Sequence, residues 1–506
     1  MKTRKIKYLL VGTLVFATVF SVAGTTMKKQ GPLPLTPDIE WEKTYGSDTN
    51  DWGNCVAKTS DSGYIVCGTY GRNVWSLWFS YLYLVKVDAA GKEQWDQVLG
   101  EYTMDHIGKS VQQTSDGGYI IAGEQGAGFR YDAFVIKTDG SGNILWSRVV
   151  GAYDAYDSGR CVQETPDGGY IVAGTTQSYG AGGADAWLIK FDANGNQLWN
   201  RTYGGPNMDI GDFIDRTADG GYVIFGSTDN FGTSGSTDAW MIKTDGNGVE
   251  QWNKTFGGVD YEEAMSGQQT TDGGYIFAGT KQVADGTTDI WVVKTDADGT
   301  KVWEQTLGGT DYDTGYSVQQ TSDGGYFIVG DYTNTVTMNP DVYAAKLGND
   351  GSMKWNETFD RNGTEDRGYY GIQTTDHGYI ITGLTGNMMD AASDVWLIKL
   401  KPEGGSGQPE LHVVISGGIG VSATISNTGT ANATNVTWSL HVQGGLFHLI
   451  NTTKTGTITN LAIGDSITVS SDMLIGFGKI TIAAQADQVT SMVSGTQLLV
   501  FTLVNK

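Results

Sequence analysis

Seven acidic residues recur at one position of an internal repeat and are the most regular candidates for chemistry in this chain. Each lies eight or nine residues before a recurrent threonine. A ring of carboxylates could bind a cation or a polar ligand. Alternatively, each carboxylate accepts backbone N–H groups of the loops around it, and its presence in every repeat favours this scaffolding role. The seven residues are Asp51, Asp105, Asp157, Asp209, Glu262, Asp313 and Asp366.

One segment, the predicted loop between the second and third strands of the first repeat, breaks the regularity of the repeats. Residues 70–81 carry a cluster of aromatic side chains, and such a cluster beside acidic residues suits carbohydrate or protein binding if it is exposed. The alternative is that the rings cover the centre of the fold or pack on a neighbouring repeat. The candidate ligand-binding aromatic residues are Trp75, Trp78, Phe79 and Tyr81.

The sequence contains no recognisable catalytic constellation. Its five histidines are scattered. Neither a Cys/His spacing typical of metal ligands nor a nucleophile elbow nor a phosphate loop is present. We therefore predict no catalytic residue, no metal site and no cofactor, and an enzymatic role is the less favoured interpretation.

A lysine also recurs, once in each repeat, on a segment typical of a β-strand. Repetition of this kind favours an ion pair between neighbouring repeats, or an aliphatic stem buried under an exposed charge, over a catalytic role. The seven lysines are Lys86, Lys137, Lys190, Lys243, Lys294, Lys346 and Lys399.

These residues are positioned by a repeat of 51 to 55 residues, whose regularity predicts a β-propeller. A tryptophan and a tyrosine mark each repeat. The tryptophans are Trp41, Trp95, Trp146, Trp199, Trp252, Trp303 and Trp355. The tyrosines are Tyr64, Tyr119, Tyr170, Tyr222, Tyr275, Tyr326 and Tyr379.

Each repeat holds four short segments rich in aromatic and β-branched residues and separated by Gly, Asp and Asn, which predicts the four strands of one blade. The first tryptophan segment, 39–46, precedes any complete repeat, and the last repeat lacks this segment. Pairing the two ends gives an all-β fold, a seven-bladed propeller over 39–400 closed by the N-terminal strand.

Outside the repeats, the chain divides into a basic and apolar N-terminus and a C-terminal module. Residues 1–23 are typical of a secretory signal peptide, with an uncleaved N-terminal anchor as the alternative, and 24–38 form a linker. A second linker, 401–409, leads to 410–506, where short alternating segments predict a β-sandwich.

Export makes the cysteines and the sequons interpretable. Cys55 and Cys67 lie at equal distance from a hairpin tip, so we expect them to face each other, either as a disulfide or as two buried thiols. Cys161 has no predicted partner. Seven candidate glycosylation sites follow the Asn-x-Ser/Thr pattern: Asn200, Asn253, Asn356, Asn362, Asn432, Asn435 and Asn451.

The formal net charge of −23 disfavours nucleic acid and anionic lipid as partners, because both bind basic surfaces. Contact with a membrane is expected only through an N-terminal anchor. Together with the export signal, the charge indicates a secreted or cell-surface protein.

The turn Thr165 to Tyr170, the strand Asp185 to Lys190 and the strand Gly195 to Trp199 resemble the repeats of secreted archaeal and bacterial β-propeller proteins, distantly similar to quinoprotein-type propellers. The segment 425–436 resembles immunoglobulin-like adhesion modules of prokaryotic surface proteins. Neither family has one activity, so the resemblance implies architecture alone. We expect a non-catalytic surface binding or adhesion protein whose partner is a cell-envelope protein or a glycan. The alternative is a propeller hydrolase or lyase that acts on extracellular polysaccharide.

Overall fold

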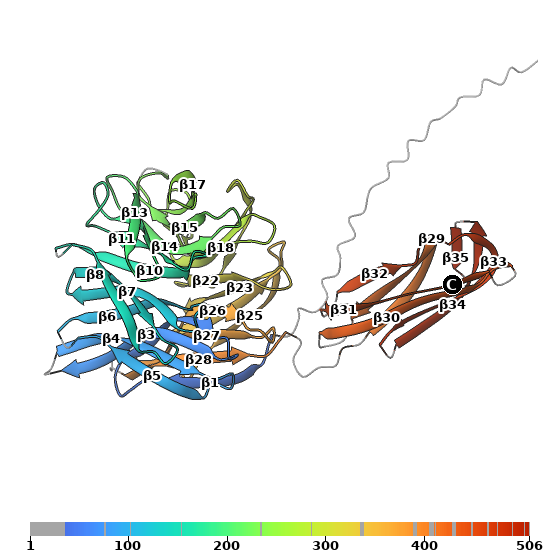
Figure 1. The fold of residues 1–506 in the computed structure, drawn as a ribbon, viewed down its shortest axis with the longest axis horizontal. Helices are drawn as coiled ribbons and strands as arrows, with labels where there is room; N and C mark the ends of the chain where they lie inside the picture. Colours follow the sequence, from blue (N-terminus) through green and yellow to red (C-terminus); the bar gives the residue numbers. More distant parts are fainter. Residues whose placement is uncertain are drawn as a thin grey trace, which may run out of the picture. The chain divides into compact units, whose positions relative to one another are not determined.

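The structure is a computed structural model that describes residues 36–504, apart from short gaps. The gaps are 75–76, 102, 153, 233–234, 285, 334–337, 388–391, 404–408, 410, 428–431, 447–448, 463–464, 473, 488 and 500. The described residues form strands and turns and contain no α-helix (Figure 1). No helix in this part of the chain could therefore span a membrane. The signal peptide predicted for residues 1–23 lies outside the described residues.

Residues 39–400 form seven four-stranded antiparallel sheets, numbered here in chain order. Sheet 1 contains β2 (Asp51–Lys58), β3 (Tyr64–Val74), β4 (Leu77–Val87) and β5 (Glu93–Leu99). Sheet 2 contains β6 (Asp105–Gln113), β7 (Tyr119–Ala127), β8 (Arg130–Thr138) and β9 (Ile144–Val150). Sheet 3 contains β10 (Asp157–Glu164), β11 (Tyr170–Thr176), β12 (Asp185–Phe191) and β13 (Gln197–Tyr203).

The remaining four sheets repeat this pattern. Sheet 4 contains β14 (Asp209–Arg216), β15 (Tyr222–Thr228), β16 (Asp238–Thr244) and β17 (Glu250–Phe256). Sheet 5 contains β18 (Glu262–Gln269), β19 (Tyr275–Gln282), β20 (Thr288–Thr295) and β21 (Lys301–Leu307). Sheet 6 contains β22 (Thr314–Gln320), β23 (Tyr326–Thr333), β24 (Pro340–Leu347) and β25 (Met353–Phe359). Sheet 7 contains β26 (Glu365–Gln373), β27 (Tyr379–Asn387), β28 (Ala392–Leu400) and the N-terminal strand β1 (Ile39–Tyr45).

The predicted closure by the N-terminal strand is confirmed. β1 pairs antiparallel with β28, from Ile39 opposite Leu400 to Tyr45 opposite Val395. One side-chain contact supports the ladder: Lys399 Nζ lies 3.1 Å from Glu40 Oε2. The Tyr45 hydroxyl donates to the Gly91 carbonyl at 2.5 Å, in the β4–β5 turn, and so joins β1 to sheet 1. The chain therefore completes its last sheet with its first strand, so that sheet 7 has four strands like the other six sheets.

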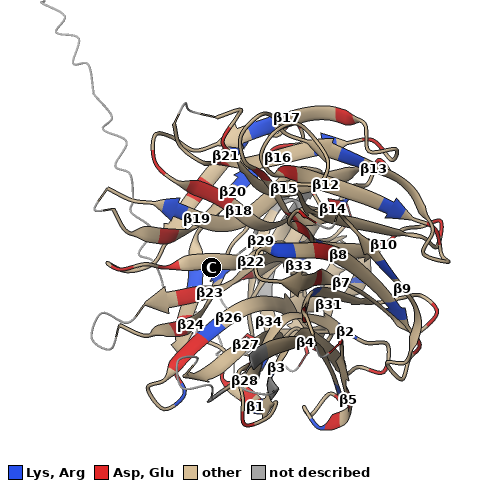
Figure 2. Ribbon diagram, turned by 90° about the vertical axis from the view of Figure 1, so that its left-hand side faces the viewer, with Lys and Arg blue, Asp and Glu red and all other residues tan. Residues whose placement is uncertain are grey.

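Each sheet contacts the next, and sheet 7 contacts sheet 1, so the sheets form a closed ring of the β-propeller class. In Figure 2 the first strands β14, β18 and β22 lie toward the middle of the ring and β13, β17 and β21 toward its outside. The repeat tryptophan and tyrosine join neighbouring sheets. For example, Trp95 of sheet 1 packs on Tyr119 of sheet 2 with ring centroids 5.8 Å apart. This contact explains why both residues recur in the sequence.

The recurrent lysines pair within a sheet, and the predicted ion pair between neighbouring repeats is therefore wrong. Lys190, on β12, is almost fully buried and reaches the Asp167 carboxylate at 3.0 Å, in the β10–β11 turn of the same sheet. The same pair forms in every sheet. The aspartates that accept from the seven lysines are Asp61, Asp116, Asp167, Asp219, Asp272, Asp323 and Asp376. The lysine thus ties the third strand of each sheet to its first turn.

The C-terminal region forms one seven-stranded antiparallel sheet with the order β31-β30-β33-β34-β35-β29-β32. A long strand, β29, pairs with β35 near Gly418 and with β32 from Ser422 onward. The buried residues of this sheet include Val421, Leu440 and Ile482. The strands are β29 (Leu411–Asn427), β30 (Ala433–Gly444), β31 (Ile450–Leu461), β32 (Ser466–Ser470), β33 (Gly476–Ala486), β34 (Val489–Leu499) and β35 (Phe501–Val504).

Candidate functional site

The recurrent acidic residues lie at the start of the first strands and are bound to their own loops. Asp209 accepts the Gly205 N–H at 2.7 Å and the Asn230 side-chain amide at 2.6 Å. Asp313 accepts the N–H groups of Gly309 and Thr333 at 2.6 and 2.8 Å. Because these bonds satisfy backbone donors that would otherwise be orphaned, the geometry favours the scaffolding role over a shared ligand site.

Asp105 departs from this pattern. It accepts the Ser80 N–H at 2.8 Å and the Tyr131 hydroxyl at 2.9 Å. Counted back from Thr114, the residue aligned with the other acids is His106, which is buried, and burial lowers the pKa of its imidazole. The acidic ring therefore has a histidine at its second position.

The aromatic segment 70–81 is a strand extension and not the loop that the sequence suggested. β3 and β4 continue their ladder to Val74 opposite Leu77, and Tyr70 lies opposite Tyr81. Tyr81 is buried, so its assignment as an exposed binding residue is wrong. Phe79 is half-buried. Trp75 and the side chain of Trp78 lie outside the described residues.

A second ring of residues was not anticipated from the sequence, and it arises from a bulge in every first strand. In sheet 4, Gly211 pairs with Gly226 and Phe213 pairs with Phe225, so Asp212 is the extra residue. A bulge redirects side chains. The bulge residues, five positions before the recurrent threonine, are Asn54, Lys109, Arg160, Asp212, Met265, Tyr316 and Tyr369.

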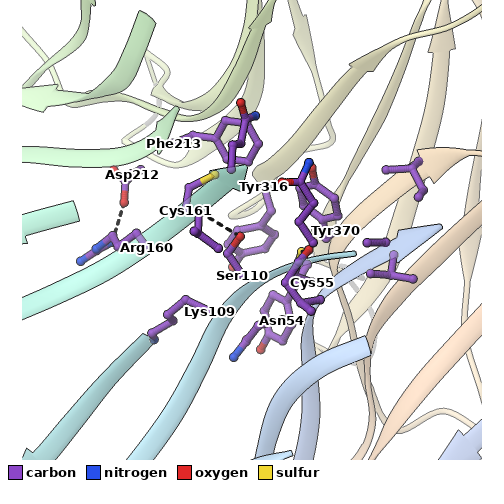
Figure 3. Close-up of a pocket in the computed structure, with 18 of the residues that line it drawn as sticks. Asn54, Cys55, Lys109, Ser110, Arg160, Cys161, Asp212, Phe213, Tyr316 and Tyr370 are labelled. Atoms are coloured by element: carbon purple, nitrogen blue, oxygen red, sulfur yellow. Dashed lines mark hydrogen bonds and ion pairs between the residues drawn. The ribbon is translucent and has the colours of Figure 1, made fainter. Parts of the chain in front are cut away.

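All seven bulge residues line one central cavity of about 490 Å³, and we call them the bulge ring (Figure 3). The residues that follow them in the chain form the next layer. Cys55, Ser110 and Cys161 are small and leave space on the side of sheets 1 to 3. On the other side, Phe213 of sheet 4 stacks on Tyr370 of sheet 7, with centroids 6.2 Å apart. The cavity is therefore an off-centre cup bounded by an aromatic wall.

The charged members of the bulge ring are paired. Arg160 Nη1 lies 2.5 Å from Asp212 Oδ1, and the dashed line in Figure 3 marks this ion pair. Lys109 Nζ lies 3.1 Å from Glu124 Oε1, and Glu124 Oε2 accepts a hydrogen bond from the Tyr156 hydroxyl at 2.8 Å. Asp212 is the one carboxylate among the described residues that line the cavity. The ring therefore presents donors of fixed orientation and little net charge.

Burial and ion pairing act on the pKa values of these groups in opposite directions. Burial raises the pKa of Asp212, although Arg160 opposes the shift. Burial would also raise the pKa of Glu124, but the Lys109 charge, the hydrogen bonds that the carboxylate accepts and the Arg160 charge together outweigh it, and the pKa falls. The Glu124 carboxylate is therefore held ionised beside the ring.

Two tyrosines supply the aromatic part of the ring. Tyr316 and Tyr369 meet edge to face, with centroids 5.3 Å apart. Burial raises the pKa of both hydroxyls, so they stay protonated and can donate hydrogen bonds. A further ion pair joins Arg367 Nη1 to Asp331 Oδ2 at 2.9 Å. The cup thus combines ring faces with hydrogen-bonding groups.

The cysteines lie where the sequence placed them. Cys55 and Cys67 are directly opposite in the β2–β3 ladder. Both are buried free thiols in the structure, so a disulfide between them stays a prediction. Cys161 is also buried, and burial raises the pKa of its thiol to about 12.

The candidate glycosylation sites differ in access. Asn356, Asn362, Asn435 and Asn451 are exposed. Asn253 is half-buried and bonded to Trp240 and Glu250, and Asn200 is half-buried on β13. Asn432 is half-buried as well. Glycosylation at any of them stays a prediction.

Neither a protein-family model nor a curated protein matches this chain. Solved structures do resemble it. Sqt1 from Chaetomium thermophilum is 10% identical, covers 72% of this chain and 99% of its own, and has a TM-score of 0.40. The β-propeller domain of the Trilobed protease from Pyrococcus furiosus is 7% identical, covers 69% of this chain and 95% of its own, and has a TM-score of 0.40. A gluconolactonase from Xanthomonas campestris is 12% identical, covers 58% of this chain and 95% of its own, and has a TM-score of 0.31. Structural similarity at these TM-scores supports no inference about function.

Proposed function

We propose that this chain is a non-catalytic, extracytoplasmic or cell-surface binding protein that holds a glycan in the cup formed by the bulge ring. In this proposal the seven sheets are the blades of a seven-bladed β-propeller. The seven-stranded C-terminal sheet folds on itself as an immunoglobulin-like sandwich, which acts as a spacer or contacts the cell envelope. The chain reaches this location through its N-terminal signal peptide or anchor.

The observation that carries the proposal is the contrast between the bulge ring and the scaffold around it. The scaffold repeats the same tryptophan, tyrosine, lysine and aspartate in sheet after sheet. The ring, by contrast, holds six residue types at its seven positions. Such variation on a rigid frame is typical of a recognition site.

The chemistry of the ring suits a sugar. A saccharide offers hydroxyl groups for Arg160 and Asp212 and an apolar ring face for Tyr369, and tyrosine provides both an apolar ring and a polar end. The cavity volume of about 490 Å³ falls within the roughly 300–1,000 Å³ of small-molecule sites. The aromatic hairpin at 70–81 gives a second contact for a longer ligand.

The alternative, a polysaccharide hydrolase or lyase, is less well supported. Glycoside hydrolysis commonly uses two carboxyl groups, one as acid and one as base or nucleophile. Among the described residues that line the cup, Asp212 is the one carboxyl group, and Arg160 pairs with it. A second acid would have to come from elsewhere.

A glycan array and a cell-envelope extract, screened with wild-type protein and with the double variant Trp75→Ala/Trp78→Ala, test the proposal. We expect a glycan to bind the wild type and the hairpin variant to lose part of that affinity. Incubation of the bound glycan with wild-type protein should leave it unchanged. Release of shorter sugars would instead support the enzyme alternative.

A further inference from the structure

Neighbouring first strands are joined by a side chain near the end of each strand, two positions before the recurrent threonine. At most junctions this residue is a glutamine, and Gln112 of sheet 2, for example, accepts the Glu164 N–H of sheet 3 at 2.6 Å. Each such bond satisfies an N–H on the free edge of the next first strand. The bond recurs from Arg216 to Gln163, from Gln269 to Asp215, from Gln320 to Gln268 and from Gln373 to Gln319.

Gln163 makes this link through both ends of its carboxamide. Its Oε1 accepts the Arg216 N–H at 3.2 Å, and its Nε2 donates to the Ile214 carbonyl at 3.1 Å. The Ile214 carbonyl also accepts the Cys161 thiol, whose Sγ lies 3.8 Å away. One carboxamide thus supplies an acceptor and a donor to the free edge of β14.

Sheet 1 interrupts this series. Cys55 Sγ donates to the Val111 carbonyl at 3.8 Å, which repeats the thiol contact between sheets 3 and 4. Two residues after this cysteine, however, the chain has Ala57 in place of glutamine. A methyl group can neither accept the Gln113 N–H nor donate to the Val111 carbonyl. The edge of β6 therefore presents a backbone donor and a carbonyl that a thiol, a weak donor, serves.

The junction between sheets 7 and 1 also lacks the glutamine, but it is filled differently. The aligned residue there is Ile372, which is buried in an apolar cluster with Val56 and Tyr64. Its side chain is much larger than that of alanine. The junction of sheets 7 and 1 therefore leaves less space than the junction beside Ala57.

The open edge of β6 lies where the central cavity extends along the first strands of sheets 1 to 3. Ala57, Val111 and Gln113 all line the cavity. Tyr370 of the aromatic wall lines it as well and packs, like Ala57, against the apolar cluster that contains Cys55 and Val111. An aromatic ring and a pair of hydrogen-bonding groups therefore meet at one side of the cup.

The missing carboxamide defines what a bound molecule must supply at this edge. It needs an acceptor for the Gln113 N–H and, on a neighbouring atom, a donor for the Val111 carbonyl. Two neighbouring hydroxyl groups of a sugar provide both, because each hydroxyl can donate and accept. A carboxylate can only accept, and a trans acetamido group directs its C=O and N–H to opposite sides. A pair of neighbouring hydroxyl groups is thus the group that fits.

We propose that Ala57 opens a subsite of the cup between sheets 1 and 2, where two neighbouring hydroxyl groups of a bound sugar replace the glutamine carboxamide. One hydroxyl accepts the Gln113 N–H, and the other donates to the Val111 carbonyl. The apolar face of the sugar lies against Tyr370. The inference rests on the proposed glycan-binding function and adds Ala57 to it as a residue that determines specificity.

The substitution Ala57→Gln tests the subsite, because it supplies the carboxamide from the chain itself. The probes are cellotriose, mannotriose and galactotriose, measured by titration calorimetry. At least one of these sugars should bind the wild type, and that sugar should bind Ala57→Gln at least tenfold more weakly. Ala90→Gln, the same change in the exposed β4–β5 turn of sheet 1, is the matched control and should bind as the wild type does.

Hydrogen exchange at the Gln113 amide gives a second measurement. In the free wild-type protein this amide should exchange at least tenfold faster than the equivalent Glu164 amide, which bonds to Gln112. Saturation with the bound trisaccharide should slow it, and so should Ala57→Gln without sugar, whereas Ala90→Gln should not. Ala57→Gln should also keep at least the thermal midpoint of the wild type, because it adds two hydrogen bonds.

The outcomes separate the subsite from the cup. Binding that Arg160→Met/Asp212→Leu weakens and Ala57→Gln does not would keep the proposed function and overturn the subsite. Equal binding after periodate oxidation and borohydride reduction, which remove neighbouring hydroxyl pairs, would do the same. Failure of all three sugars to bind would overturn the subsite and leave the proposed function to the glycan array. Binding of the tripeptide Gly-Gln-Gly in their place would assign the cup to a peptide and overturn both.

Discussion

Phe213 and Tyr370 stack on each other across the central cavity, with ring centroids 6.2 Å apart and planes inclined by 23°. They come from the first strands of sheets 4 and 7, which are not neighbours in the ring. At the same position, sheets 2, 5 and 6 carry Ser110, Ser266 and Ser317. Two large residues in an otherwise small layer thus decide where the cup is open.

The first prediction is an energetic coupling between these two rings. Phe213→Ser and Tyr370→Ser should each destabilise the protein by less than the roughly 3–5 kcal/mol of a fully buried Phe→Ala change, because both rings are half-buried. The double variant should lose less than the sum, by about 0.5–1.5 kcal/mol. Urea unfolding of the four proteins measures the cycle, and additive losses would show that the stack contributes nothing.

The second prediction concerns the buried acid Asp51. Burial raises its pKa to about 6, above the ordinary value, so the folded protein holds this proton more tightly than the unfolded chain does. Ionisation therefore lowers the free energy of unfolding as pH rises from about 4 to 6. Asp51→Asn lacks this dependence.

The free energy of unfolding of the wild type, minus that of Asp51→Asn, should therefore be larger at pH 4 than at pH 7. The change should be on the order of 1–3 kcal/mol. Denaturant unfolding at four pH values measures it, with Asp298→Asn in an exposed turn as the control. A difference that stays constant with pH would show that Asp51 ionises normally.

The third prediction is an asymmetry in the ion pair of Lys190 and Asp167. The lysine side chain is 6% exposed and the aspartate 60%. Asp167→Ala leaves a buried charge with fewer partners and should cost about 2–3 kcal/mol, near the lower end for breaking a buried pair. Lys190→Met removes that charge and should cost less. Thermal or urea unfolding compares the two, and the opposite order would contradict the account of the recurrent lysine.

The fourth prediction tests the closure by β1. Deletion of residues 1–46 removes the β1–β28 ladder and Trp41, whose ring packs on Tyr64 at 6.4 Å. Loss of an aromatic contact and a strand should cost at least the roughly 3–5 kcal/mol of a large aromatic truncation. Deletion of residues 1–37 keeps β1 and is the control. Equal thermal midpoints for the two truncations would contradict the closure.

The sequence predicted the scaffold well because each of its parts recurs. Repetition of Trp199 and Tyr222 and their equivalents located the strands, and the incomplete repeat at each end predicted the pairing of β1 with β28. The bulge ring escaped prediction because Asp212 and its equivalents share a position but not one common residue type. The recurrent glycine just before it, as in Gly211, was the available signal of a bulge.

A further difference has a local cause. Alternation along residues 70–81 did not reveal that the hairpin continues, so Tyr81 was assigned to a loop although it pairs with Tyr70 in the ladder.

The most direct test of the proposed binding role is the dissociation constant of the glycan found in the screen, measured for variants of the bulge ring. Tyr369→Ala removes one aromatic face. Arg160→Met/Asp212→Leu removes both charges together and so leaves neither buried alone. Phe129→Ala, which truncates a side chain that is 97% exposed, is the control.

Each ring variant should bind at least tenfold more weakly, which corresponds to a loss of about 1.4 kcal/mol, while Phe129→Ala binds as the wild type does. Circular dichroism should show that all variants keep the strand content of the wild type. Unchanged affinity in both ring variants would place the binding site elsewhere and contradict the central claim.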